Sequence, residues 1–256
     1  MRKRGLKIPA LLMLAALQLL CTVSAAGENP GQQLFEKHTT FSEQEKKEIT
    51  WWLYTPEEIR EDTALVVFLH GSGEMGDGAL AQALPAFMAD GTLQGVPAVV
   101  LVPQLPKGVG AWVRIDDALE KAVGETTETY GLKPENAALC GFSMGGIGAM
   151  DIANRNPGRY QRILVAAGRV NKSVKIASFT GREVRFYVGK RDFQIRPETV
   201  YSFRRMLERA GIAVSLTELN TDHLGTMRAV FTDPEAMRWL FTGEGEKRNE
   251  SGELTP

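Results

Sequence analysis

The stretch ALCGFSMGGIGAM, residues 138–150, carries the strongest signal in the chain. An apolar run leads into the pentapeptide GFSMG (residues 141–145), which has the pattern G-x-S-x-G, and a segment of helical length follows. A serine on a sharp turn between a strand and a helix is exposed, and it needs small neighbours to avoid both elements. The helix N-terminus directs partial positive charge to the same point. The pattern predicts a nucleophile at Ser143; the alternative is a serine that only caps a closely packed helix.

Short runs rich in β-branched and aromatic residues alternate with segments of helical length from Ile49 onward. The runs predicted as strands are 49–54, 64–69, 98–102, 137–140, 162–166, 184–188 and 214–219. The segments predicted as helices are 114–130, 143–156, 197–211 and 233–241. This alternation predicts an α/β fold with a mainly parallel sheet of about seven or eight strands and helices on both faces. Residues 167–183 are too few for a large cap domain, so we expect an open site.

Residues 1–26 have the form of a secretory signal peptide. A basic head precedes the apolar run 8–20, and small residues follow at 23–26. The apolar run is shorter than the roughly 20 residues that span a bilayer, which favours a cleaved signal over a membrane anchor. We therefore expect a secreted or periplasmic protein that has no membrane attachment after cleavage.

The remaining chain reads as one domain. We expect a polar lead-in with some helix over 27–48, a catalytic domain over 49–242 and a disordered tail over 243–256.

Composition excludes several classes of function. The chain has 30 basic and 31 acidic residues, and loss of residues 1–26 removes four basic residues and no acid, which leaves 26 basic against 31 acidic and a net charge of −5. No segment concentrates positive charge, so we expect no nucleic-acid partner. Cys140 would be the only cysteine left, which precludes an internal disulfide. The three histidines, at 38, 70 and 223, lack the spacing of paired metal ligands, so we expect no metal and no cofactor.

A nucleophilic serine needs a base, and elimination favours His223. His38 lies in the polar lead-in, and His70 begins a glycine-rich loop that its ring would brace. His223 follows the last predicted strand in the loop NTDHLG, which agrees with the chain order Ser, Asp, His of this architecture. The alternative is a solvent-exposed loop histidine.

Asp192 is the expected acid, because it follows a predicted strand and lies between Ser143 and His223 in sequence. The alternative is a surface aspartate paired with a neighbouring base, and the rival acids are Asp222 and Asp233.

A second glycine-rich stretch, FLHGSGEMGDG (residues 68–78), follows another predicted strand. It contains a literal G-x-G-x-x-G, which could bind a dinucleotide. A dinucleotide loop should open directly into a helix after the first strand, whereas here the loop continues and an earlier strand precedes it. We therefore interpret it as an oxyanion loop, in which the backbone N–H of Ser72 acts with that of Met144.

The chain resembles the α/β-hydrolase superfamily, and within it the secreted single-domain esterases and predicted peptidases near dienelactone hydrolases, polyhydroxybutyrate depolymerases and prolyl oligopeptidases. The motifs that carry the resemblance are FLHGSGEMGDG, LVPQLPKGVGAW, GFSMGGIGAMDIA, VGKRDF and TDHLG. The resemblance implies a triad of Ser143, Asp192 and His223. Relatives often have an aromatic residue soon after the histidine, where this chain has Leu224, and this difference concerns the substrate pocket.

These observations predict an exported serine hydrolase that cleaves small-molecule or polymeric carboxylic esters through an acyl-enzyme. A serine peptidase or amidase and an acyltransferase would use the same residues, and a catalytically silent binding module is a further alternative.

Overall fold

The computed structural model describes residues 34–80, 84–89 and 96–244. The proposed signal peptide and residues 245–256 of the expected tail lie outside these ranges. The described strands are β1 (Phe35–Ser42), β2 (Lys47–Tyr54), β3 (Ala64–Leu69), β4 (Ala98–Pro103), β5 (Ala138–Phe142), β6 (Arg162–Ala166), β7 (Glu183–Gly189) and β8 (Ala213–Leu219). The described α-helices are α1 (Ala86–Ala89), α2 (Asp116–Tyr130), α3 (Met144–Arg155), α4 (Glu198–Arg209), α5 (His223–Phe231) and α6 (Pro234–Thr242).

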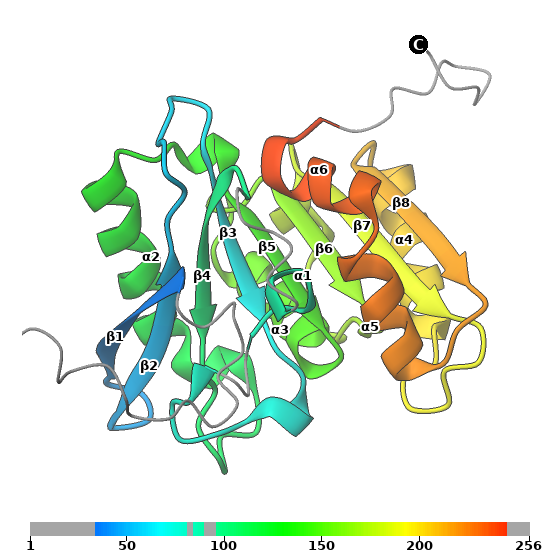
Figure 1. Cartoon of the computed structure of the whole chain (residues 1–256). Helices are drawn as coiled ribbons and strands as arrows, with labels where there is room; N and C mark the ends of the chain where they lie inside the picture. The colour runs from blue at the N-terminus through cyan, green and yellow to red at the C-terminus, as the bar shows by residue number, and fades with distance from the viewer. Residues whose placement is uncertain (1–33, 81–83, 90–95, 245–256) are drawn as a thin grey trace, which may run out of the picture.

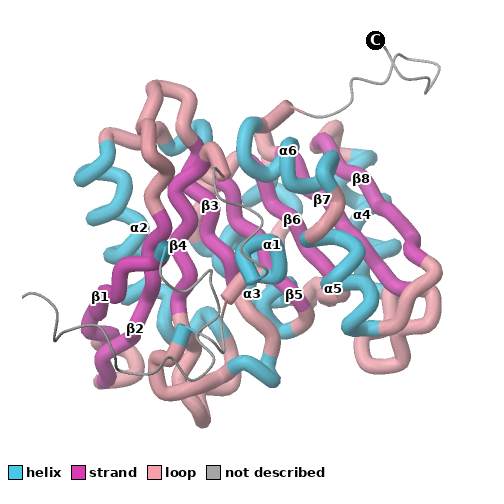
Figure 2. The backbone as a smooth tube through the Cα atoms, viewed as in Figure 1, coloured by secondary structure: helices cyan, strands magenta, loops and turns pink. Residues whose placement is uncertain are grey.

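The strands form one eight-stranded sheet in the order β1-β2-β4-β3-β5-β6-β7-β8 (Figures 1 and 2). The pairs β1–β2 and β2–β4 are antiparallel, whereas β4, β3, β5, β6, β7 and β8 run parallel to one another. The α/β prediction with a mainly parallel sheet is confirmed, and all seven predicted strands are present. The carboxyl ends of six strands therefore lie along one end of the sheet, where ligand sites form in such folds.

The expectation of a polar lead-in with some helix over 27–48 is wrong from Phe35 onward. These residues form β1, which pairs with β2 along its whole length. The Trp51 indole donates a hydrogen bond to Thr40 Oγ1 at 3.0 Å, and the His38 ring stacks on Trp51 with centroids 4.3 Å apart. An edge strand pairs on one side and keeps polar residues on an exposed face, so no continuous apolar run marks it in the sequence.

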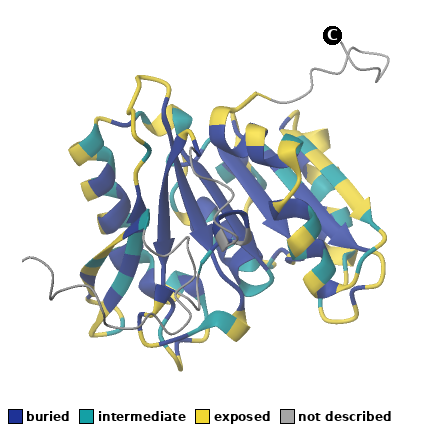
Figure 3. Cartoon of the chain, viewed as in Figure 1, coloured by how far each residue is buried: buried dark blue, intermediate teal, exposed yellow. Residues whose placement is uncertain are grey.

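Each face of the sheet packs against its own set of helices, because successive residues of a strand point to opposite faces. In β3, Leu65 and Leu69 belong to one apolar cluster, and Val66 and Phe68 belong to the other. Helices α2, α3 and α4 cover the first face, and α1, α5 and α6 cover the second (Figure 1). Figure 3 shows the result: the central strands are buried throughout, whereas exposed and half-buried residues alternate along much of the outer strand β8.

The segment between β6 and β7 holds a 3-10 turn, η6 (Ile176–Phe179), and no α-helix. Within the described ranges, no helix combines the length and the apolar composition needed to cross a bilayer.

The turn between β5 and α3 is tight enough to exclude side chains at two glycines. Ser143 has φ 55° and ψ −116°, a conformation rarely adopted by residues other than glycine. A Cβ on Gly145 would lie 1.8 Å from the Leu69 carbonyl oxygen, and one on Gly141 would lie 2.4 Å from the carbonyl of Gly145. The G-x-S-x-G spacing is therefore a steric requirement of placing α3 on the end of β3.

We expect Gly145→Ala to destabilise the fold by about 2–3 kcal/mol or more, since its methyl group would overlap backbone atoms that have no room to move. Gly124→Ala is the matched control, because a Cβ at this helical position meets nothing within 4 Å; it should gain about 0.5–1 kcal/mol. Urea unfolding of both variants measures the difference. Equal stability of the two variants would contradict the steric account.

We expect Cys140 to react slowly with thiol reagents in the native protein. The residue is completely buried in β5, and this burial raises the pKa of the thiol far above its ordinary value. On a Cys21→Ser background, which leaves one thiol, modification in buffer should be about 100-fold or more slower than in urea. Rapid modification of the folded protein would show that β5 opens readily or is not buried.

Candidate active site

Ser143, His223 and Asp192 form one hydrogen-bonded chain at the carboxyl end of the sheet. Ser143 Oγ lies 2.9 Å from His223 Nε2, and His223 Nδ1 lies 2.6 Å from Asp192 Oδ2. The carboxylate accepts from Nδ1–H, which leaves Nε2 as the acceptor for the serine hydroxyl. The three side chains proposed from sequence are thus brought together in the order that nucleophile activation requires.

His223 is the first residue of α5 and does not lie in the loop that the sequence predicted. Asp222 is the N-cap of this helix, and its Oδ1 accepts from the Gly225 N–H at 2.7 Å. The helix was missed because the polar residues 220–222 before it, including its cap Asp222, look like part of a loop in the sequence. His223 is 7 % exposed, and its ring packs on the Phe142 ring, with centroids 4.8 Å apart. The helix start fixes the direction of the imidazole, which a flexible loop would not.

Asp192 is buried. The alternative interpretation, a surface aspartate paired with a neighbouring base, is therefore wrong. Its Oδ1 accepts from the N–H groups of Gln194 and Ile195 at 2.8 and 2.9 Å, which directs Oδ2 to His223. The rival acids are engaged elsewhere: Asp222 caps α5, and Asp233 caps α6 through the N–H groups of its first turn.

The glycine loop (residues 70–78) lies against the start of α3, because the Gly145 backbone packs on the carbonyls of Leu69 and His70. His70 braces this loop as expected: its Nδ1 donates to the Gly71 carbonyl at 2.7 Å, and its Nε2 accepts from Leu105 N–H at 3.0 Å. Burial lowers the pKa of His70 to about 4, so the ring is neutral near pH 7.

Ser72 begins the 3-10 helix η2 (Ser72–Glu74) in this loop, and Met144 begins α3. The first N–H groups of a helix have no partner within it, and that of Met144 is among them. Sequence reasoning missed the acidic residue Glu74, which is half-buried here. Its only signal was a carboxylate inside a glycine-rich loop, which does not distinguish a buried acid from an exposed one.

Two large apolar side chains are exposed beside this chain of residues. Phe193, next to Asp192, is 92 % exposed, and Leu224, next to His223, is 50 % exposed. The loop that carries Phe193 adjoins the segment before α5, which carries Leu224, since Arg191 N–H donates to the Thr221 carbonyl at 3.0 Å.

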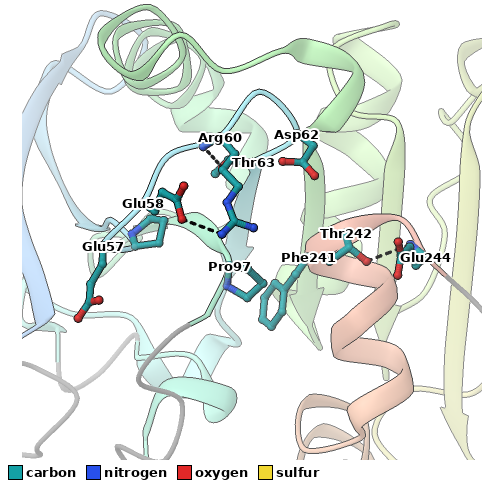
Figure 4. A pocket seen from close by; sticks show the side chains of 10 residues that line it. Glu57, Glu58, Arg60, Asp62, Thr63, Pro97, Phe241, Thr242 and Glu244 are labelled. Atoms are coloured by element: carbon teal, nitrogen blue, oxygen red, sulfur yellow. Dashed lines mark hydrogen bonds and ion pairs between the residues drawn. The ribbon is translucent and has the colours of Figure 1, made fainter.

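A separate pocket of about 350 Å³ opens at the other end of the sheet (Figure 4). Thr63 and Pro97, which line it, directly precede β3 and β4, and Arg60 forms an ion pair with Glu58 at 2.7 Å. Its lining residues include no serine, cysteine or histidine. Nor does any group of three or more His, Cys, Asp or Glu side chains in the described part of the chain have the arrangement of a metal site.

Comparison with known proteins agrees with the fold. The family model described as "Putative esterase" matches residues 114–238, slightly less than half of the chain. No curated protein sequence matches significantly.

Solved structures with the same fold include a thermostable esterase, which has a TM-score of 0.68 and 22% sequence identity. The match covers 81% of this chain and 62% of that protein. The S-formylglutathione hydrolase of Staphylococcus aureus has a TM-score of 0.58 and 12% identity over 80% of this chain and 95% of its own. The ferulic acid esterase of the anaerobic fungus Anaeromyces mucronatus has a TM-score of 0.60 and 18% identity over 86% of this chain and 92% of its own.

The likeness to these structures concerns the fold, and the family model matches the part of the chain that contains Ser143, Asp192 and His223. The chain has the fold of these α/β-hydrolase esterases, and nearly half of it matches the family model described as "Putative esterase".

Proposed function

We propose that the protein is an exported serine hydrolase that cleaves carboxylic esters through an acyl-enzyme, with Ser143, His223 and Asp192 as its triad. The observation that carries the proposal is the unbroken chain of hydrogen bonds from Ser143 Oγ through the imidazole to the Asp192 carboxylate. A free hydroxyl is a poor nucleophile at neutral pH, and a base within hydrogen-bond distance removes that limitation.

In the first half of the reaction, Ser143 Oγ attacks the ester carbonyl carbon while His223 Nε2 takes the hydroxyl proton. The tetrahedral intermediate collapses when the imidazolium returns this proton to the leaving alcohol, and the acyl group stays on Oγ. Water then repeats the sequence: Nε2 takes its proton, its oxygen attacks the acyl carbon, and the proton goes back to Ser143 as the acid leaves. Asp192 holds the ring and stabilises the imidazolium in both halves.

The negative oxygen of each tetrahedral intermediate needs fixed donors. We assign this role to the backbone N–H groups of Ser72 and Met144. The packing of Gly145 on Leu69 and His70 supports the assignment, because it brings the glycine loop and the first turn of α3 together. One such donor contributes about 10²–10³ to kcat in enzymes of this type.

Substrate and location follow from less direct observations. The exposed Phe193 and Leu224 support an ester with an apolar group, which would remain in contact with their side chains. The signal-like composition of residues 1–26 supports export. The mechanism uses side chains and backbone alone, so it requires no cofactor.

We expect a fluorophosphonate to label the native protein once per chain, at Ser143. Ser143→Ala should abolish both labelling and ester turnover, because no other nucleophile shares the base. Ser202→Ala, an exposed serine on α4, is the matched control and should keep both. Peptide mapping by mass spectrometry identifies the labelled residue. A label at another serine, or no label on a folded protein, would eliminate the proposal.

The same preparation separates ester hydrolysis from its rivals. Aryl acetates should be hydrolysed much faster than aminoacyl anilides, and added alcohol should not compete with water. Faster anilide cleavage would indicate a peptidase, and transfer to the alcohol would indicate an acyltransferase.

We expect Asp192→Asn to lower kcat by about 10⁴, the loss seen when a triad acid no longer holds the imidazole in its reactive tautomer. Asp222→Asn should cost about tenfold or less, because asparagine also caps helices and this side chain is directed to Gly225. Both variants are assayed on one activated ester after circular dichroism has verified their folding. A large loss of kcat in Asp222→Asn, together with a nearly normal kcat in Asp192→Asn, would show that Asp222 and not Asp192 is the triad acid.

A further inference from the structure

Glu74 is an acidic residue of the glycine loop whose carboxylate is directed inward. Its Oε2 lies 2.8 Å from the position that a Cβ on Gly71 would occupy, and the Phe142 ring lies 3.1 Å from the same position. Phe142 in turn packs on His223. The carboxylate therefore lies at the start of the glycine loop, close to the aromatic ring that packs on the imidazole.

The hydrogen bonds of Glu74 close the turn that contains Ser72. The Gly71 carbonyl accepts from Glu74 N–H at 3.3 Å, and the Gly71 N–H donates to the Glu74 carboxylate. The Glu74 carbonyl accepts from the Gln104 side-chain amide at 2.5 Å, which ties the turn to the segment after β4. Both ends of the three-residue η2 are thus fixed, and the side chain of Glu74 supplies one of the contacts.

The charges around the imidazole come from three elements. Asp192, after β7, is bonded to Nδ1, and Asp222 is turned toward Gly225 at the start of α5. The third is Glu74 from the glycine loop, and the charge of His223 acts on its carboxyl group. Residues 142–143, from β5 and the turn before α3, bring an uncharged ring and a hydroxyl. Burial raises the pKa of the Glu74 carboxyl, whereas the hydrogen bond from Gly71 and the charge of His223 act in the opposite direction.

We propose that Glu74 is a positioning residue of this reaction: its carboxylate holds the turn that presents Ser72 N–H, and its negative charge favours the protonated His223 formed during catalysis. The inference rests on the proposed function. The position of the carboxylate near the Phe142 ring, which packs on His223, supports a role beyond stabilising the loop. In a half-buried position, its attraction to the imidazolium is screened less than it would be in water.

The two contributions of Glu74 are separable by substitution. Glu74→Gln keeps an oxygen that accepts from Gly71 N–H but removes the charge, whereas Glu74→Ala removes both. Asp77→Asn is the matched control, since it removes one negative charge from an exposed position of the same loop. All three are compared with the wild type in kcat, KM, melting temperature and the dependence of kcat/KM on pH.

We expect Glu74→Gln to move the acidic limb of the kcat/KM profile to lower pH by about 0.5 unit, because a protonated imidazole is less favoured without the nearby charge. Its kcat at the plateau should stay within about threefold of the wild type. Glu74→Ala should lower kcat by about 10–100-fold with little change in KM, since the oxyanion donor is then misplaced. Asp77→Asn should change neither quantity.

Two results would overturn the inference: a Glu74→Gln profile that coincides with that of Asp77→Asn, or a Glu74→Ala variant whose kcat equals that of the control even if its melting temperature falls. Ester turnover and Ser143 labelling of the wild type are measured alongside. If the wild type is active and only the Glu74 results fail, the triad proposal stands; if the wild type neither turns over ester nor is labelled, the proposed function itself fails.

Discussion

The site depends on one close contact between two backbone segments. Gly145 packs directly on the carbonyls of Leu69 and His70, at a distance that admits no side chain. The contact places the first turn of α3 on the end of β3, and the chain turns between them at Ser143 with a positive φ of 55° and ψ of −116°. Such a conformation costs about 1–3 kcal/mol and persists where surrounding structure holds it. Here the Ser143 N–H donates to the Ala166 carbonyl at 2.9 Å, and Ile147 N–H donates back to the Ser143 carbonyl at 3.0 Å.

The base and the acid meet because their strands are neighbours in register. Gly189, at the end of β7, lies opposite Leu219, at the end of β8, so the two following loops begin side by side. Lys190 N–H donates to the Leu219 carbonyl at 2.8 Å, and a Cβ on Gly189 would lie 2.5 Å from Thr226 Oγ1. Within this framework, each loop closes through its own aspartate: Asp192 accepts two N–H groups of its loop, and Asp222 caps α5.

The glycine loop combines a neutral histidine with an acid in the space of five residues. Burial lowers the pKa of His70 to about 4, so this ring serves as a fixed donor and acceptor and brings no charge to the site. His223, by contrast, is hydrogen-bonded to the carboxylate of Asp192. His70 and His223 thus differ in role because His70 is bonded to backbone groups and His223 to a carboxylate.

From the sequence alone we predicted the fold class and the serine and histidine of the proposed triad, because strand–helix alternation and G-x-S-x-G depend on local sterics and on chain order. The sequence did not reveal β1, whose polar residues satisfy an edge strand, or α5, whose cap Asp222 resembled a loop residue. It also left Asp192, Asp222 and Asp233 as competing acids. Tertiary structure decided among them, since strand register brings Asp192 within hydrogen-bond distance of His223, with Oδ2 2.6 Å from Nδ1. The burial of Glu74 was likewise settled by packing, because a carboxylate in a glycine-rich loop has the same sequence signature whether it is exposed or half-buried.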